Sequence, residues 1–211
     1  MSQNSKPTPL QKLVKDGRFI ASAFLLITGS WLDIHNSATI QANWPNRQPI
    51  PDSLFLLLPY IGWTQYFSDL ANIFSIILLA IYLFPQRWQK LPFALSILGL
   101  GYLLRSMLEL LNPYGGPLGN IAYYGITKIH QFGQFPSGHT MLVVIIYYLI
   151  DRDEAPLLSN LALGSIAVEV ASLLLSHGHY SIDIVGGFFV AYFSYHELKK
   201  HQSQLTIPEE N

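Results

Sequence analysis

Two histidine segments carry the side chains that are best suited to chemistry. In the segment His177 to Asp183, the residues His179 and Asp183 are four positions apart, so on a helix they share one face and can hydrogen-bond. A carboxylate on one ring nitrogen fixes the tautomer and leaves the other nitrogen unprotonated. That arrangement is typical of an activated nucleophile held in place by a neighbouring group. A His-x-x-x-Asp pair taken alone is equally expected as a structural hydrogen bond.

The other segment, Phe135 to Thr140, predicts a helix start that binds an anion. A proline, then Ser137 and Gly138, stand ahead of His139 and an apolar run, which is how a helix begins. The N–H groups of a first turn, together with a serine hydroxyl, bind anions readily. His139 lies within that turn, where it could contact a bound phosphate or donate a proton to it.

The elements that position these residues are predicted to cross a membrane. Of the 211 residues, 50% are hydrophobic and 12% are charged, whereas a soluble domain carries about 25% charge. Six apolar stretches come near the length of about 20 residues that a bilayer requires. They are Phe19–Leu32, Ser68–Phe84, Leu91–Leu111, Ser137–Ile150, Leu157–Ser176 and Ile182–Tyr195.

We therefore expect an all-α, polytopic bundle of about six transmembrane helices. One catalytic domain is expected at residues 18–198, between polar cytoplasmic tails at residues 1–17 and 199–211. The first stretch is interpreted as an uncleaved anchor rather than a signal peptide, because no clear small-residue cleavage site follows it. No Asn-x-Ser/Thr site occurs, which fits a bacterial inner membrane.

The Lys and Arg residues of the predicted loops indicate the orientation. Nine lie on the side of the two tails, and only Arg47 and Lys128 lie in loops on the other side. Positive charge favours the cytoplasm, so both termini are expected there. This orientation gathers seven ionisable side chains in the non-cytoplasmic half: Asp69, Arg105, Glu109, His139, Glu169, His179 and Asp183.

A charge at the bilayer centre costs about 2.5–3.5 kcal/mol, so the gathered set favours a functional site over chance. The alternative is that these side chains are hydrogen-bond partners that hold the bundle together. For Asp69 and Glu169, taken singly, the two interpretations are equally expected.

The string Ser137-Gly138-His139-Thr140, followed by His179-Tyr180-Ser181-x-Asp183, resembles the type 2 phosphatidic acid phosphatase (PAP2) superfamily. It is most similar to the sphingomyelin synthase-related branch. The resemblance covers the third to sixth predicted helices and also fits the six-helix layout.

The resemblance implies roles for six residues. His179 would attack phosphorus to form a phosphohistidine, Asp183 would orient it, and His139 would protonate the leaving alkoxide. The phosphate oxygens would be held by Arg105, Ser137 and the N–H of Gly138. No metal and no other cofactor is implied.

Some positions depart from the family pattern. Asn112 and Leu173 stand where the phosphatase branch has basic residues, and Gln131–Gly133 replaces the Cys-Gly-Asp of the synthase branch. The sequence therefore falls between the branches, and the resemblance does not assign a substrate. A site with fewer cations suits a phosphodiester slightly better than a dianionic monoester.

The function expected is cleavage or transfer of lipid phosphate esters at the non-cytoplasmic face, with water or a lipid hydroxyl as the acceptor. The lack of a basic stripe argues against a nucleic-acid partner, and the absence of cysteine excludes disulfides and a cysteine nucleophile. Three alternatives stay open: a transporter or channel, a haem or metal protein that uses His139 and His179 as ligands, and a catalytically inactive scaffold.

Lesser expectations concern the surroundings of the site. His177 is expected in a loop, and Tyr180 is expected among the interfacial aromatic residues with Trp31, Trp44 and Trp63. Gly186 and Gly187 are expected to allow close helix packing.

Overall fold

The computed structural model describes residues 8–84, 86–111, 113–117 and 134–208, and all regular structure within them is helical. The long helices are α2 (Gly17–Asn43), α4 (Gln65–Leu83), α5 (Leu91–Leu111), α6 (Gly138–Leu149), α7 (Pro156–Leu175) and α8 (Ser181–Lys199). The short ones are α1 (Pro9–Lys15), α3 (Leu54–Leu57), α9 (Gln202–Leu205) and the 3₁₀ turns η1 (Gly62–Thr64) and η2 (Trp88–Lys90).

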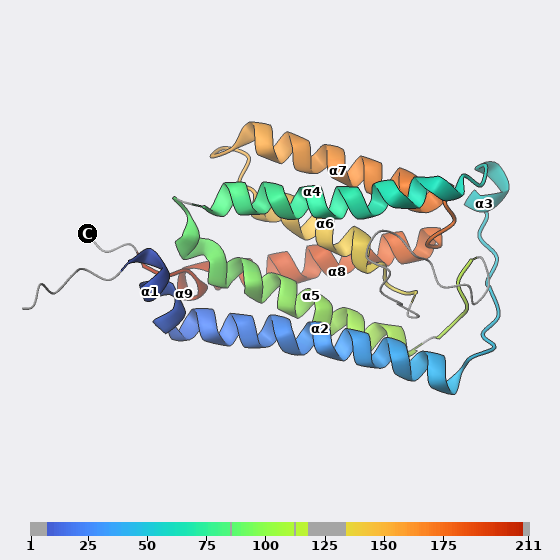
Figure 1. Cartoon of the computed structure of the whole chain (residues 1–211), viewed down its shortest axis with the longest axis horizontal. Coiled ribbons are helices and arrows are strands. Elements are labelled where there is room, and N and C mark those ends of the chain that lie inside the picture. The colour runs from blue at the N-terminus through green and yellow to red at the C-terminus, as the bar shows by residue number, and fades with distance from the viewer. Residues whose placement is uncertain (1–7, 85, 112, 118–133, 209–211) are drawn as a thin grey trace, which may run out of the picture.

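The long helices run side by side, with α1 and α9 at one end of the bundle and α3 at the other (Figure 1). Helix α2 packs along α5, and α4 packs along α7. Helix α6 lies at the centre, in contact with α4, α5, α7 and α8. Its residues Met141, Val143 and Ile145 are fully buried. No residue of α6 is classed as exposed, so this helix forms the core of the bundle.

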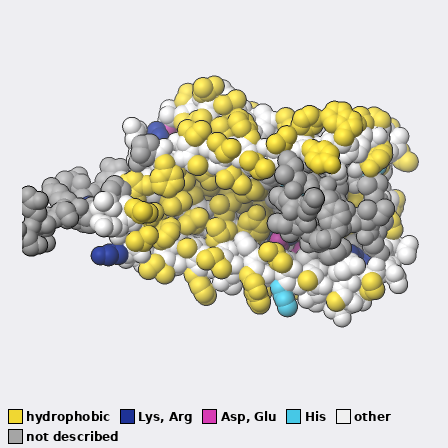
Figure 2. Space-filling view, viewed as in Figure 1, with side chains coloured by type: hydrophobic (Ala, Val, Ile, Leu, Met, Phe, Trp, Pro, Cys, Tyr) yellow, Lys and Arg dark blue, Asp and Glu magenta, His cyan; other side chains and the backbone are white. Residues whose placement is uncertain are grey.

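The distribution of side chains is that of a membrane protein. On α4 the apolar Phe74 and Ile77 are 42% and 48% exposed, whereas the polar Ser75 between them is fully buried. Apolar side chains cover a large part of the described surface in Figure 2, and Lys and Arg are sparse on this face. An apolar exterior around buried polar groups is stable in lipid, where the exterior is not in contact with water.

Four helices of the described chain are long and apolar enough to cross a membrane, namely Gly17–Asn43, Gly62–Leu83, Trp88–Leu111 and Pro156–Leu175. Helix α6 is also apolar but has only 12 residues. The chain is accordingly an all-helical integral membrane protein. The finer expectation of six spans also requires α6 and α8 to cross.

The observed helix bounds follow the predicted apolar stretches to within three residues, except at the end of the first one and at the end of the sixth, where α8 continues to Lys199. Helix α5 spans the expected residues, Leu91–Leu111. Helix α2 continues to Asn43, well beyond Leu32, so the predicted end was wrong. The reason is that Asp33 and Ser37 are buried against the bundle, and polarity at these positions does not mark the end of the helix.

Candidate active site

His179 lies in the short connection between α7 and α8, braced by the carboxylate of Asp183 in the first turn of α8. The distance from Nδ1 of His179 to Oδ2 of Asp183 is 3.1 Å. The same oxygen accepts the N–H of Tyr180 at 3.0 Å, and Oδ1 accepts the hydroxyl of Tyr114. Asp183 is fully buried, and its oxygens have protein donors. The Asp183 carboxylate therefore holds the proton of His179 at Nδ1 and leaves Nε2 with a lone pair.

Burial of the His179 ring also acts on its protonation. It lowers the pKa of His179 below the ordinary histidine value, and the hydrogen bond to Asp183 opposes this effect only in part. The neutral ring, which is the nucleophilic form, is thereby favoured near neutral pH.

His139 lies in the first turn of α6 and has a carboxylate of its own. Its Nε2 is 3.3 Å from Oδ1 of Asp69 on α4. The centroids of the two imidazole rings, of His139 and His179, are 6.2 Å apart. The side chain of His139 is 27% exposed and that of His179 is 10% exposed. Two imidazole–carboxylate pairs thus face each other across one small space, and His139 is the more accessible.

Hydrogen bonds and close packing join the starts of α6 and α8. The backbone N–H of Ser137 donates to the carbonyl oxygen of Asp183 at 2.9 Å. A Cβ added at Gly187 would lie 2.7 Å from the carbonyl oxygen of Ser137. A Cβ at Gly186 would lie 2.5 Å from the ring of Phe135. The predicted close packing at both glycines is confirmed, since any larger residue would push the two histidine segments apart.

Ser137 is the N-cap of α6. Its hydroxyl oxygen accepts the backbone N–H of Thr140 at 3.3 Å and the hydroxyl of Thr140 at 3.2 Å. The hydroxyl hydrogen of Ser137 is still available for donation to a ligand. The first N–H groups of the helix, beginning with that of Gly138, have no acceptor within the helix.

Arg105 of α5 lies against this first turn and is almost completely buried, with 1% exposed. Its Nε donates to the carbonyl oxygen of Pro136 at 2.9 Å. Its Nη1 pairs with Asp33 of α2 and lies 3.5 Å from Glu109. Arg105 therefore positions the loop that leads into α6, and the carboxylate of Asp33 balances its positive charge.

Residues 135–200 match the family described as "PAP2 superfamily C-terminal". This span contains both histidine segments, and it also contains Gly186 and Gly187, which pack against Phe135 and Ser137. The chain carries a PAP2 superfamily C-terminal domain.

Two relatives from Caenorhabditis elegans extend the match toward the N-terminus. The chain is 28% identical over 238 residues to phosphatidylcholine:ceramide cholinephosphotransferase 1, covering 93% of this chain and 48% of the relative. It is 24% identical over 194 residues to phosphatidylcholine:ceramide cholinephosphotransferase 2, covering 72% and 57%. The chain thus spans about half the length of these curated relatives, and it is distantly related to lipid phosphotransferases.

The structure brings the six predicted site residues to one end of the bundle. One of them comes from α5 and the others from the PAP2 domain: Arg105, Ser137, Gly138, His139, His179 and Asp183. Asp69, for which site and bundle-holding roles were equally expected, contacts His139. Glu169 is instead an interhelical partner, because its two oxygens accept the hydroxyl of Ser68 at 2.7 Å and the amide of Asn72 at 2.8 Å. Glu169 thereby fixes the face of α4 on which Asp69 lies.

Two contributors were missed from the sequence. Asp33 could have been recognised, because a carboxylate within an apolar helix needs a partner. Tyr114 could not, because nothing in its local sequence indicates that its hydroxyl reaches Asp183, 69 residues away.

The prediction of an interfacial Tyr180 was wrong. Tyr180 is 1% exposed, its hydroxyl donates to the carbonyl of Gly115 at 2.9 Å, and the same oxygen accepts the N–H of Ile50 at 3.0 Å. It anchors two loops over the start of α8, which a surface residue could not do. Trp31, Trp44 and Trp63 are exposed, as interfacial aromatic residues would be.

His177 lies in the loop, as expected. Its φ is 49°, and its ring stacks on that of Phe55 with the centroids 4.1 Å apart.

The departures from the family pattern are only partly covered by the structure. Leu173 is buried, so an apolar side chain occupies the position of a family arginine. Asn112, Lys128 and Gln131–Gly133 lie outside the described residues. Within the described ranges, no group of three or more His, Cys, Asp and Glu is placed to hold a metal ion.

Proposed function

We propose that this protein transfers or cleaves phosphate esters of lipids through a phosphohistidine at His179. The observation that carries the proposal is the pair of imidazoles 6.2 Å apart, each with its own carboxylate. The proposal includes six transmembrane spans, with α6 and α8 among them, both termini in the cytoplasm and the histidine pair at the non-cytoplasmic face. The loop charges support this orientation.

In the first half-reaction, Nε2 of His179 attacks the phosphorus atom. A bond forms between nitrogen and phosphorus as the bond from phosphorus to the leaving oxygen breaks. His139 gives its proton to that oxygen, so the product leaves as an alcohol. Asp183 stabilises the positive charge that His179 acquires, while Asp69 supports the protonated ring of His139.

In the second half-reaction, an acceptor hydroxyl attacks the phosphohistidine. His139, now neutral, takes the proton of the acceptor, and the bond between phosphorus and nitrogen breaks. His179 is thereby restored as a neutral ring. Water as acceptor gives a phosphohydrolase, and a lipid hydroxyl gives a phosphotransferase.

The non-bridging oxygens of the phosphate are held by the start of α6. The N–H groups of its first turn, the Ser137 hydroxyl and the positive end of the helix all favour an anion at this place. Arg105 contributes positive charge from behind the turn. Because Asp33 offsets much of that charge, a singly charged phosphodiester suits the site better than a dianionic monoester.

Transfer from a phosphodiester lipid is accordingly favoured over hydrolysis of a monoester. The names of the two relatives, which describe transfer from phosphatidylcholine to ceramide, support the same reaction class.

The test uses the purified full-length protein in lipid nanodiscs. Phosphatidic acid and phosphatidylcholine serve as donors, with and without ceramide as acceptor. A new lipid that carries the head group indicates transfer, and release of phosphate or phosphocholine indicates hydrolysis. Labelled donor, quenched at high pH, should leave an acid-labile label on the wild type.

The matched variants are His179→Ala, which removes the nucleophile, and His201→Ala, which removes an exposed histidine after α8. The first should lose both turnover and labelling, and the second should keep both. The proposal fails if the wild type and His179→Ala behave alike with every donor.

A further inference from the structure

A cavity lies at the end of the bundle opposite to the histidine pair. Its volume is about 370 Å³, and it is lined by residues of α4, η2, α5, α6, α7, α8, α9 and the loop after α6. On α8, Lys199 at the cavity is 16 residues from Asp183, a rise of about 24 Å. The two sites therefore cannot share one small ligand. In the proposed orientation, this cavity opens to the cytoplasm.

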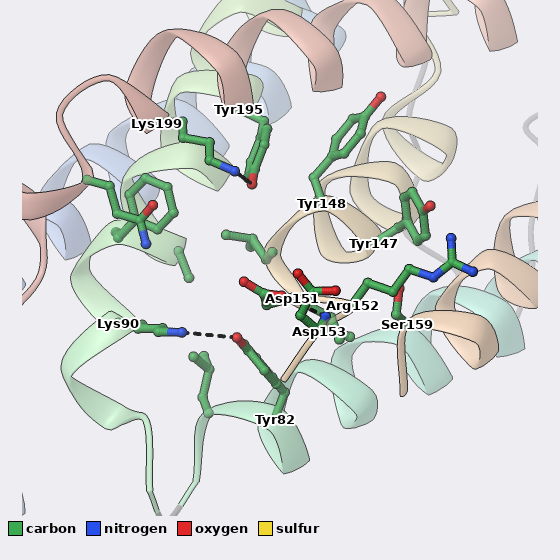
Figure 3. A pocket seen from close by; sticks show the side chains of 16 residues that line it. Tyr82, Lys90, Tyr147, Tyr148, Asp151, Arg152, Asp153, Ser159, Tyr195 and Lys199 are labelled. Atoms are coloured by element: carbon green, nitrogen blue, oxygen red, sulfur yellow. Dashed lines mark hydrogen bonds between the residues drawn. The ribbon is translucent and has the colours of Figure 1, made fainter. Parts of the chain in front are cut away.

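Four tyrosines and two lysines give the cavity its character (Figure 3). Lys90 donates to the hydroxyl of Tyr82 at 3.2 Å, and Lys199 donates to the hydroxyl of Tyr195 at 2.9 Å. Each ammonium also lies over the ring of its tyrosine, 5.5 Å and 5.1 Å from the centroid. Tyr148 stacks on Tyr195 at 5.0 Å. Two ammonium groups are thus held at the wall of one cavity by aromatic side chains.

The charges around the cavity are of both signs, with one positive charge in excess. Glu154, outside the lining, accepts hydrogen bonds from Lys90 and Arg87, each at 2.8 Å. These contacts hold the pKa of Glu154 at about 2, so it stays ionised. Four cations stand near three carboxylates: Arg87, Lys90, Arg152 and Lys199 near Asp151, Asp153 and Glu154.

Charges of both signs around one cavity favour a ligand that carries both a phosphate and hydrogen-bond donors. The lysines favour a phosphate, while Asp151, Asp153 and the tyrosine oxygens accept hydrogen bonds from hydroxyl or ammonium groups. A volume of about 370 Å³ lies within the range of small-ligand pockets, about 300–1,000 Å³. Close to Tyr82 in sequence, Ile81 and Phe84 are 56% and 50% exposed. Acyl chains could lie along this apolar surface while the headgroup enters the cavity.

We propose that this cavity is a second, non-catalytic site for a phosphodiester headgroup that carries hydroxyl or ammonium donors. Basic pockets between helices on the cytoplasmic side are suited to lipid headgroups. The ligand would link α4, α5, α6 and α8 at one end and stabilise the bundle without entering the reaction.

The experiment is a titration of the full-length protein, followed by native mass spectrometry and by thermal unfolding. The lipid arm uses short-chain phosphatidylglycerol and phosphatidylethanolamine, with diacylglycerol as the probe that lacks phosphate. The soluble arm uses glycerophosphoglycerol and inorganic phosphate. A site for a lipid headgroup binds the phospholipids more tightly than glycerophosphoglycerol, and a site for a soluble phosphate ester binds both equally.

Lys199→Gln is the decisive variant, because Lys199 is exposed at the helix end and its loss does not threaten the fold. Lys200→Gln is the matched control, since Lys200 pairs with Glu197 at 2.6 Å and is absent from the cavity lining. Loss of a charged hydrogen bond costs about tenfold or more in affinity.

We expect Lys199→Gln to bind one lipid fewer at the concentrations that fill both sites, with Lys200→Gln unchanged. Equal binding by the wild type and Lys199→Gln would overturn the proposal, as would binding of diacylglycerol that matches that of the phospholipids. The same titration on the His179→Ala protein separates this proposal from the proposed reaction, because that variant lacks the nucleophile. If neither the phospholipids nor the soluble esters bind to it, the proposed second site is overturned.

Discussion

The two ends of the bundle treat charge differently. At the histidine end the charged groups are buried and paired, with Arg105 1% and Asp183 0% exposed. At the tyrosine–lysine end the side chains of Arg87, Lys90 and Glu154 are 27–40% exposed. A buried pair loses much when one member is removed, whereas a half-exposed pair is screened by water. The first end suits fixed geometry for a reaction, and the second suits an adaptable binding surface.

The largest expected effect comes from Asp183→Asn. An amide can hydrogen-bond to His179 in either direction, so the tautomer with a free Nε2 is no longer enforced. We expect turnover to fall by about 10³- to 10⁴-fold, as when the orienting carboxylate of a catalytic triad is replaced. Rates with the preferred donor, measured beside Lys200→Gln, provide the check, and a loss of less than tenfold would reduce Asp183 to a structural role.

Removal of Arg105 tests how much stability is lost when a buried carboxylate loses its cation. Arg105→Gln leaves Asp33 without the guanidinium, and we expect a loss of about 3–5 kcal/mol in the free energy of unfolding. The double variant Arg105→Gln, Asp33→Asn should recover part of that loss, because no carboxylate is stranded. Unfolding in mixed micelles measures both, and equal stability of the single variant and the wild type would contradict the comparison.

Asp69→Asn is expected to have a smaller effect on the reaction. The carboxylate supports the protonated ring of His139 from 3.3 Å away. Its loss should slow turnover by about 10- to 100-fold, which is less than the full contribution of a general acid, about 10²- to 10⁴-fold, because His139 itself is retained. The fall should appear in kcat rather than in KM, because the phosphate is bound elsewhere. A change in KM alone would assign Asp69 to substrate binding.

The pH profile tests the His179 environment. Burial lowers the pKa of His179, and protonation at low pH removes the nucleophile. Activity should therefore persist as the pH falls below the ordinary histidine pKa of about 6.5, and only then decline by about tenfold per pH unit. The dependence of kcat/KM on pH measures this acidic decline. A decline that begins above pH 6.5 would be incompatible with the buried neutral ring.

The smallest effect is expected at the other end, from Glu154→Gln. The half-exposed contacts to Arg87 and Lys90 are worth about 0–1 kcal/mol. The pKa of Glu154 is lowered to about 2, so its contribution is present above the ordinary carboxyl pKa and is lost as the pH falls toward 2. Thermal unfolding between pH 3 and 7 should therefore show a small difference at pH 7 that shrinks on acidification.

Local pattern predicted the parts of the molecule that depend on short-range spacing. The His179–Asp183 pair follows from four residues of separation, and α5 follows from a 21-residue run in which Arg105 and Glu109 are the charged residues. The partner of His139 could not be predicted, because Asp69 is 70 residues away and the packing of α4 decides the contact. The end of α2 was missed because hydropathy measures polarity, whereas Asp33 is polar and buried.

The orientation of the chain and the roles of the site residues stay predictions. The loop charges support the orientation, the family resemblance supports the roles, and the variants above test the roles.

The contact of Gly187 with Ser137 has a mechanical consequence. The proposed nucleophile, His179, and the proposed proton donor, His139, are attached to two helices whose starts pack closely at Gly187 and Ser137. The distance between the two rings is therefore set by that joint and not by the side-chain rotamers alone. Thermal motion of either helix should carry the other with it and preserve the alignment. A single methyl group at the joint would act as a wedge and misalign both partners without altering either imidazole.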